Sequence, residues 1–335
     1  MKKSLLALAV LGAFAGAASA QSSVTLFGIV DANVRYVQAD GFDDRKTVNT
    51  DGINGSRLGF KGVEDLGGGL KAGFWLEAGF NPDTGNLGNG GTDSSNRLFR
   101  RRATISLISN FGEIRLGRDY VPTFWNLTTF DPFGTNGVGN SGNVWHPAVA
   151  ANLVRHDNTV GYFLPSGLGG FYGQVMVASS EGSGTHYTGG RGGWAAGAFD
   201  IAGAYSEEDL IGGGKLKVAN AGASYDFGFL KASGIYMETS LNGYHNKGYL
   251  VGLNVPIGAG EIHAAYTQRD GDTSDDTAKQ FALGYVHNLS KRTALYATGS
   301  YIENGSLARH AVDGSTMVNF GGKSSGMEVG VRHAF

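Results

Sequence analysis

The chain has 335 residues, with 56 glycines, only 6 prolines, no cysteine and a formal net charge of −2. The lack of cysteine excludes a disulfide framework, and abundant glycine without proline or a Gly-X-Y repeat excludes collagen and ordinary disorder. A mean hydropathy of −0.14 is too low for a helical membrane protein, and the absence of a basic stripe argues against nucleic-acid binding.

Residues 1–20 have the features of a cleaved export signal. Lys2 and Lys3 supply a positive start, residues 5–17 are apolar, and residues 18–20 (Ala-Ser-Ala) form a small-residue cleavage site. The apolar stretch is shorter than the roughly 20 residues that a spanning helix needs. We therefore expect residues 21–335 to be one domain without a transmembrane helix.

Alternating apolar and polar residues predict a strand over residues 24–36. Leu26, Val30 and Val34 fall on one face, whereas Asp31 and Arg35 fall on the other. The same alternation recurs over residues 70–80, 261–269 and 295–301. Strands with one apolar and one polar face suit a barrel with lipid outside and water inside.

Short and long connections separate these strands. The short connections have turn chemistry and lie at residues 65–68, 226–228, 256–260 and 288–291. The long connections are polar and rich in Gly, Asn and Asp, and they are predicted at 38–54, 81–96, 179–193, 270–276 and 304–323. Two strands and their connections take roughly 40 residues, so the mature chain predicts about sixteen strands.

A longer segment, between Arg118 and Asn152, shows no strand pattern. A loop of this length inside a compact fold is usually functional. Residues 137–142 match a dinucleotide-binding Gly-x-Gly-x-x-Gly spacing, but no strand–helix–strand context surrounds them. We therefore interpret these glycines as loop residues.

The last ten residues form an amphipathic strand that ends on Phe335. Met327, Val329 and Val331 lie on the same side as this terminal aromatic, and Glu328 lies on the other. A soluble protein would rarely expose such an edge, whereas a transmembrane barrel can finish with it. We expect Phe335 to be an assembly signal that the barrel-assembly machinery reads.

Over essentially its whole mature length, the chain resembles the general-diffusion porins of Gram-negative bacteria, of the β-proteobacterial and neisserial type. The stretches that carry the resemblance are 23–28, 56–72, 111–118, 158–162 and 332–335. The resemblance implies an all-β, sixteen-stranded antiparallel transmembrane barrel in the outer membrane. It also implies a homotrimer, a third long loop folded into the lumen, contact with lipid and lipopolysaccharide, and no cofactor.

The resemblance also implies a pore constriction. Its residues would be wall arginines opposed by carboxylates, namely Arg57, Arg101, Arg155, Asp119, Asp131 and Glu77. Further candidates for lining the pore are Arg100, Arg102, Lys61, Lys71, Asp31 and Arg35. If the three arginines outweigh one or two of the loop carboxylates, Asp119 and Asp131, the pore is expected to have a mild preference for anions despite the negative net charge. Alternatively, these arginines snorkel to the membrane edge or contact other subunits.

The triplet at residues 100–102 leaves two orientations open. Simple strand alternation places Arg100 and Arg102 inside, whereas the family motif favours Arg101.

Other function classes remain as alternatives to passive diffusion of ions and small hydrophilic solutes. An adhesin or receptor barrel would act through its outer loops. A lipase or protease would need a nucleophile motif, and none is present. A sugar-specific porin would need an aromatic track, for which Trp75, Tyr120 and Trp125 are the only hints. The eight histidines have no metal-ligand spacing.

Overall fold

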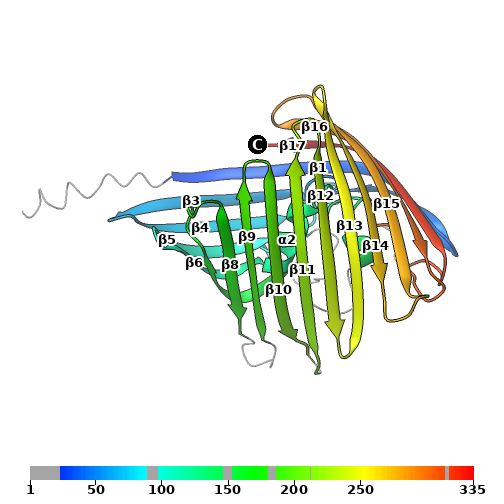
Figure 1. Ribbon diagram of the computed structural model, residues 1–335. Helices are drawn as coiled ribbons and strands as arrows, with labels where there is room; N and C mark the ends of the chain where they lie inside the picture. The colour runs from blue at the N-terminus through cyan, green and yellow to red at the C-terminus, as the bar shows by residue number, and fades with distance from the viewer. Residues whose placement is uncertain (1–22, 89–96, 146–152, 180–185, 212, 314–316) are drawn as a thin grey trace, which may run out of the picture.

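The computed structural model describes residues 23–88, 97–145, 153–179, 186–211, 213–313 and 317–335. The predicted export signal lies outside these residues. All the described strands form one antiparallel sheet, and the sheet closes on itself because the last strand pairs with the first (Figure 1).

Strand bounds in the first half of the barrel are β1 Ser23–Ala39, β2 Phe42–Asn49, β3 Arg57–Gly67, β4 Leu70–Gly79, β5 Arg102–Ser109, β6 Gly112–Tyr120, β7 Arg155–Phe163 and β8 Phe171–Ala178. The second half contains β9 Tyr187–Ala196, β10 Phe199–Asp209, β11 Lys215–Asp226, β12 Lys231–Leu241, β13 Tyr244–Ile257, β14 Gly260–Asp270, β15 Thr277–Asn288, β16 Thr293–Asn304 and β17 Lys323–Ala334.

These seventeen segments make a sixteen-stranded barrel, because β2 and β3 together form one interrupted strand. β2 pairs with the second half of β1, and β3 pairs with its first half. Between them, residues 50–56 leave the sheet. The predicted fold class and strand count are confirmed.

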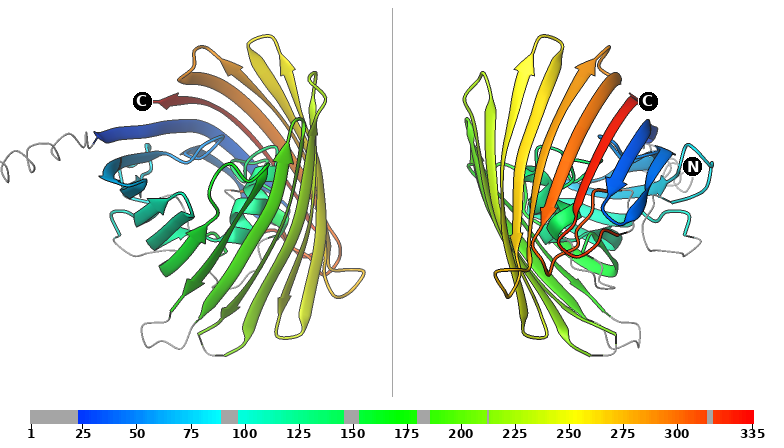
Figure 2. Two further views of the ribbon diagram at one scale, coloured as in Figure 1. Left: turned by 60° about the vertical axis from the view of Figure 1, so that its left-hand side comes forward. Right: turned by 90° about the vertical axis from the view of Figure 1, so that its right-hand side faces the viewer.

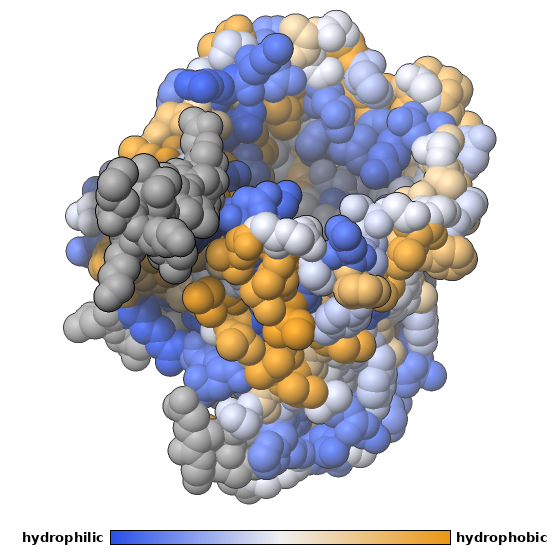
Figure 3. All heavy atoms as spheres, turned by 90° about the vertical axis from the view of Figure 1, so that its left-hand side faces the viewer, coloured by the Kyte–Doolittle hydropathy of each residue, from blue (hydrophilic) through white to orange (hydrophobic). Residues whose placement is uncertain are grey.

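Burial alternates along β1 as the sequence predicts. Leu26 and Val34 are 54% and 66% exposed, whereas Asp31 and Arg35 are buried. The exposed apolar side chains face outward, so the barrel turns its hydrophobic side to its surroundings. In Figure 3, a broad cluster of apolar side chains lies near the centre of the visible face, with hydrophilic residues above and below it.

Two predicted loops are partly strand, and those predictions were wrong. The predicted loop 38–54 contains β2, which turns back from β1 through Asp40 and Gly41, with Gly41 at a φ of 85°. Asp44 and Lys46 lie between Phe42 and Val48 on one face of β2, and the other face is polar, so its sequence lacks the usual alternation. The predicted loop 179–193 contains the start of β9, where glycines pair with β10.

The segment between β6 and β7 carries two helices, α2 Pro122–Phe130 and α3 Gly142–Trp145, which the sequence analysis did not predict. Figure 2 shows them on the concave side of the curved sheet. Asn126 of α2 donates to the Ala202 carbonyl and to the Asn220 side chain. Trp145 of α3 donates to the Gln268 carbonyl at 3.0 Å. The segment is thereby held against strands from the other half of the sheet.

The seam of the barrel joins β1 to the end of the chain. The Gly28 N–H donates to the Phe335 carbonyl, and the Phe335 N–H donates to the Gly28 carbonyl, both at 3.0 Å. Within the described part of the chain, no helix is long and apolar enough to cross a membrane.

Candidate pore constriction

Glu77, near the end of β4, binds two arginines. Its Oε1 accepts a hydrogen bond from Arg101 Nε at 2.6 Å and lies 3.3 Å from Arg57 Nη1. Its other oxygen accepts from Trp75 Nε1 at 3.0 Å. Three neighbours therefore fix the orientation of this carboxylate, which is only 4% exposed.

A third arginine reaches the same cluster through Tyr120 at the end of β6. Arg101 and Arg155 each donate to the Tyr120 hydroxyl, at 3.0 and 2.6 Å. The Arg155 guanidinium also lies 4.2 Å from the centre of the Tyr120 ring, a cation–π contact. Arg57, Arg101 and Arg155 thus converge on one carboxylate and one phenol. We call these five residues the arginine cluster.

Tyr120 also connects the arginine cluster to α2. Its ring stacks on Phe124 at 5.4 Å and meets Trp125 edge-on at 5.2 Å. Arg155 Nε and Trp125 Nε1 are buried donors without a hydrogen-bond partner among the described residues. The aromatic contacts place the first turn of the β6–β7 segment directly beside the arginines.

Asp119 lies on the wall, within β6, although the sequence analysis placed it among the loop carboxylates. It is fully buried, with Arg115 Nη1 at 2.6 Å and Arg102 Nε at 3.6 Å. Glu113 is 2.8 Å from the same Arg115. These groups form a second charged cluster next to the first, in which two arginines meet two carboxylates.

Asp131 lies in the β6–β7 segment, away from the arginine cluster. Its carboxylate accepts hydrogen bonds from the Phe133 N–H and the Ser141 hydroxyl, at 2.9 and 2.6 Å. Burial raises the pKa of Asp131, and these hydrogen bonds oppose the rise. No arginine is among the hydrogen-bond partners of Asp131 in the described residues. Its hydrogen bonds stabilise a turn within the β6–β7 segment itself.

Two arginines of the triplet turn toward these clusters. Arg102, the first residue of β5, lies over the Trp75 ring at 4.6 Å. Arg101 precedes the strand, so alternation does not govern it, and it is 8% exposed beside Glu77. The carbonyl of Arg100 accepts from Arg118 Nε at 2.6 Å.

Of the remaining candidates, Lys61 has its Nζ over the Trp75 ring, 4.9 Å from the ring centre. Lys71 is exposed beside the β3–β4 turn. Asp31 accepts hydrogen bonds from the N–H groups of residues 52, 53 and 54, at 2.9 to 3.2 Å. It therefore holds the break between β2 and β3 inside the barrel.

Arg35 belongs to a buried anchor that the sequence analysis missed. Arg35 and Glu328 are directly opposite each other in the β1–β17 pairing, with Nη2 and Oε2 2.7 Å apart. The other Glu328 oxygen accepts from the Val138 N–H at 3.1 Å. Glu328 lay on the polar face of the last strand, which is the only sequence signal for this contact.

Nothing in the described residues forms a metal site, since no group of three or more His, Asp or Glu side chains comes together as metal ligands.

Comparisons with known proteins agree with this fold. The family model described as Gram-negative porin matches residues 7–307. Outer membrane porin protein 32 of Delftia acidovorans is 40% identical over 100% of both chains, and an outer membrane porin protein of Bordetella pertussis is 32% identical over 100% of both. A major outer membrane protein P.IB of Neisseria gonorrhoeae is 25% identical, over 95% of this chain and 98% of its own.

Solved structures give the same result. The anion-selective porin from Comamonas acidovorans has a TM-score of 0.86 and 38% identity, covering 94% of this chain and 100% of its own. The trimer form of OmpT from Vibrio cholerae has a TM-score of 0.70 and 14% identity, covering 94% and 99%, so it supports the fold alone. The chain therefore belongs to the Gram-negative porin family, and it is a porin of the outer membrane.

Proposed function

We propose that this porin passes small hydrophilic solutes with a preference for anions, and that the arginine cluster sets the preference. The observation that carries the proposal is a charge imbalance. Arg57 and Arg101 pair with Glu77, the single carboxylate of the cluster, whereas Arg155 bonds only the neutral Tyr120 phenol, which leaves two positive charges at the base of the β6–β7 segment. Fixed arginines on a pore wall stabilise a passing anion without any bond-making.

The local charges outweigh the net charge of the whole chain in this proposal. Coulomb energy falls with distance and with the effective dielectric constant, so charges on the wall of a narrow pore dominate over distant surface charges. The same proposal makes the β6–β7 segment the element that narrows the lumen, because α2 and α3 lie on the concave side of the sheet (Figure 2). The anion-selective porin to which this chain is similar supports the direction of the preference.

We further propose a homotrimer in lipopolysaccharide-containing membrane, in which the outward faces of the early strands contact other subunits. Ile105 of β5 and Leu116 of β6 are exposed on that side. Phe335 is proposed to serve barrel assembly, because it completes the pairing of the last strand with β1.

The reversal potential of the purified protein in a planar bilayer, under a KCl gradient, tests the proposal. We expect an anion-side potential for the native chain and a smaller one for Arg155→Gln, with conductance retained in both. Arg292, which is exposed at the β15–β16 turn, supplies the control substitution Arg292→Gln, which should change nothing. A cation-side potential would refute the anion preference, and the absence of conductance would favour an adhesin or an enzyme.

A further inference from the structure

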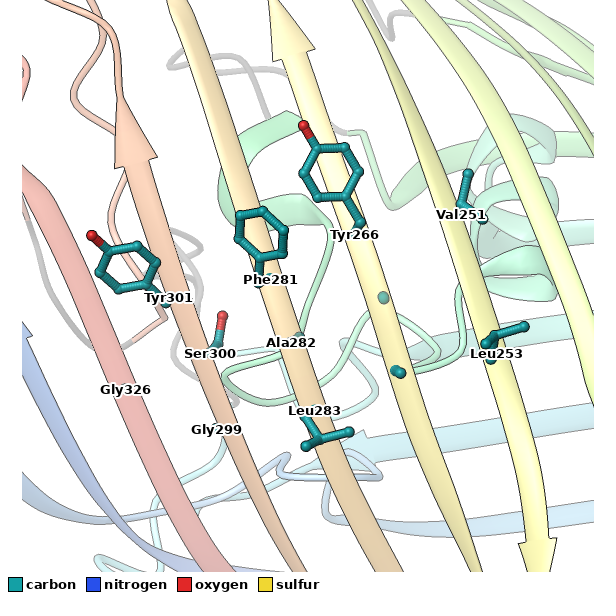
Figure 4. Close-up of a pocket in the computed structure, with 12 residues that line it drawn as sticks. Val251, Leu253, Tyr266, Phe281, Ala282, Leu283, Gly299, Ser300, Tyr301 and Gly326 are labelled. Atoms are coloured by element: carbon teal, nitrogen blue, oxygen red, sulfur yellow. The ribbon is translucent and has the colours of Figure 1, made fainter.

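Arg191 of β9 is a cation on the lumen side of the wall that does not belong to the arginine cluster. Side chains that face outward between the ends of the barrel are mostly apolar, as Leu253 and Leu283 show on β13 and β15 (Figure 4). Arg191 turns the other way and contacts Tyr172 of β8 and Asn126 of α2. Its charge therefore acts on what passes through the lumen.

The hydrogen-bond partners of Arg191 in the described residues are all neutral. Its Nε donates to Asn126 Oδ1 at 2.9 Å, and its Nη2 donates to the hydroxyls of Thr129 and Tyr172 at 3.1 and 3.3 Å. The guanidinium also lies 4.8 Å from the centre of the Tyr172 ring. These contacts fix the side chain in place but leave its positive charge without a carboxylate in direct contact.

Two donors at this place stay open. Arg191 Nη1 has no hydrogen-bond partner among the described residues, and it is not one of their buried unpartnered atoms, so lumen water reaches it. Gln174 lies directly opposite Arg191 in the β8–β9 pairing, is 9% exposed, and has a buried Nε2 without a partner. Directly opposite residues share one face of a sheet, with their Cβ atoms roughly 4.5–5.5 Å apart. Both side chains thus offer N–H groups on the same patch of wall.

Asp200 is the carboxylate closest in this network, but Tyr172 stands between it and Arg191. The Tyr172 hydroxyl donates to Asp200 Oδ1 at 2.6 Å, which leaves its oxygen free to accept from Arg191. In the β9–β10 pairing Asp200 lies opposite Ala195, whereas Arg191 lies opposite Ala204. Asp200 is therefore four residues nearer to the short β9–β10 turn, and short turns mark the periplasmic end of such barrels.

The helix α2 connects the arginine cluster to Arg191. It descends along β10 toward the periplasmic turns, since Thr123 lies 3.4 Å from the Ser206 hydroxyl and Asn126 bonds the Ala202 carbonyl. Its first half packs on Tyr120 of the cluster, and its second half bonds Arg191. A nine-residue helix is roughly 13 Å long, so an anion that leaves the cluster reaches Arg191 within that distance.

We propose that Arg191 and Gln174 form a second anion station, which receives a small oxyanion, a carboxylate or a phosphate group, on the periplasmic side of the arginine cluster. The open N–H groups of the two side chains bind its oxygens. Conduction needs sites that bind weakly enough, and in sufficient number, for an ion to leave each of them. The inference rests on the proposed anion passage and adds the residues that draw an anion out of the constriction.

Inhibition of the chloride current by inorganic phosphate, added to one side of a planar bilayer that contains the native assembly, tests the proposal. Ser274 is exposed in the β14–β15 loop, and the chain has no cysteine, so Ser274→Cys with a bulky impermeant maleimide identifies the loop side. Arg191→Gln should raise the half-inhibiting phosphate concentration on the turn side about tenfold, as expected for one lost charge-assisted hydrogen bond. Inhibition from the loop side should stay unchanged, because phosphate from there meets the arginine cluster first.

Three further variants separate a binding station from a clamp that only holds α2. Arg191→Lys keeps the charge but loses the forked contacts, so it should keep turn-side inhibition within about twofold of native. If it behaves as Arg191→Gln does, the guanidinium only positions α2 and the station is overturned. Gln174→Leu should weaken turn-side inhibition without any change of charge, and Asp200→Asn should strengthen it.

Matched controls address charge and ionic strength. Arg292→Gln removes a cation from the exposed β15–β16 turn at the same end of the barrel, and it should leave turn-side inhibition as in the native chain. Potassium chloride added at equal ionic strength should not inhibit; equal inhibition by chloride would overturn an oxyanion site. Acetate repeats the measurement with a carboxylate. An effect of Arg191→Gln on phosphate alone would restrict the station to phosphates, and an effect on neither anion would overturn it.

The same recordings separate this inference from the proposed function. Arg155→Gln should weaken phosphate inhibition from both sides, because it alters the constriction itself. If the native chain prefers anions but Arg191→Gln changes inhibition on neither side, the second station alone fails. A cation-side reversal potential of the native chain would instead overturn the proposed function, and the station with it.

Discussion

Tyr120 is the residue on which the geometry of the arginine cluster depends most. Its hydroxyl accepts hydrogen bonds from the guanidinium groups of Arg101 and Arg155, and its ring makes a cation–π contact with Arg155. Phe124 and Trp125 pack on the same ring from the β6–β7 segment. One side chain thus fixes both the position of the charges and the position of the adjacent loop.

Replacing Tyr120 with Phe should therefore weaken anion preference without removing any charge. Hydrogen bonds to charged groups contribute about 1.5–3 kcal/mol each, so Arg155 loses much of its restraint when the hydroxyl is removed. The reversal potential under a KCl gradient should shift toward zero, by less than in Arg155→Gln. Tyr162→Phe, whose hydroxyl bonds the Phe111 carbonyl at an exposed turn, is the control. An unchanged potential in Tyr120→Phe would show that the ring alone holds Arg155.

At the scale of elements, the barrel strands were predictable and the site was only partly so. Alternation is a local property of the chain, and it fixes which side of β1 or β17 faces outward. It fails where polar residues occupy both faces of most of a strand, as in β2, and where a residue precedes a strand, as Arg101 does. Asp119 and Asp131 could not be placed from sequence, because alternation shows neither that β6 extends to Tyr120 nor that Asp131 bonds Phe133 and Ser141 of its own segment.

The buried anchor between β1, β17 and the β6–β7 segment should control how firmly that segment is seated. Glu328→Ala removes the buried carboxylate partner of Arg35, which then keeps only the half-exposed Asp313, and it also removes the acceptor of the Val138 N–H. Breaking a buried ion pair from one side costs about 3–5 kcal/mol, so the temperature at which the folded barrel is lost should fall markedly. Glu303→Ala, at an exposed position of the neighbouring strand, should cost far less. Equal losses in the two variants, read from heat-modifiable gel mobility, would contradict the anchor.

A second contact with the β6–β7 segment predicts a pH effect. His310, in the loop before β17, has its Nδ1 3.2 Å from the Asn143 carbonyl. Burial, followed by the charge of Arg269, lowers the pKa of His310 to about 4. The neutral ring's contribution is therefore complete above the unfolded pKa of about 6.5 and is lost as the pH falls from 6.5 to 4.

Acidification through that window should loosen the segment and increase open-channel current fluctuations. His310→Gln should remove the dependence, because an amide side chain does not titrate there. The control variant His287→Gln, near the opposite end of the barrel, should keep the acid-dependent rise in current fluctuations. If current fluctuations rise equally in acid in the native chain and in His310→Gln, another titrating group causes the effect.

For the whole molecule, closure of the barrel depends on the seam between Gly28 and Phe335. A Cβ on Gly28 would lie 2.8 Å from the Arg57 carbonyl oxygen and 2.3 Å from a Phe335 ring carbon. The ring could rotate away, but the carbonyl belongs to the β1–β3 pairing and cannot move without breaking it. A side chain at this position therefore opposes both sides of the seam at once.

Because a barrel has no free edge only when it is closed, a defect at the seam should affect folding of the entire chain. Gly28→Val is expected to reduce the yield of heat-modifiable barrel on refolding into detergent, whereas Gly203→Val, on an open outward position, should fold as the native chain does. Adding Phe335→Ala to Gly28→Val relieves only the ring contact, so it should not restore the yield. Recovery in that double variant would instead place the obstruction at the ring, and a normal yield for Gly28→Val alone would show that the seam tolerates displacement of β3.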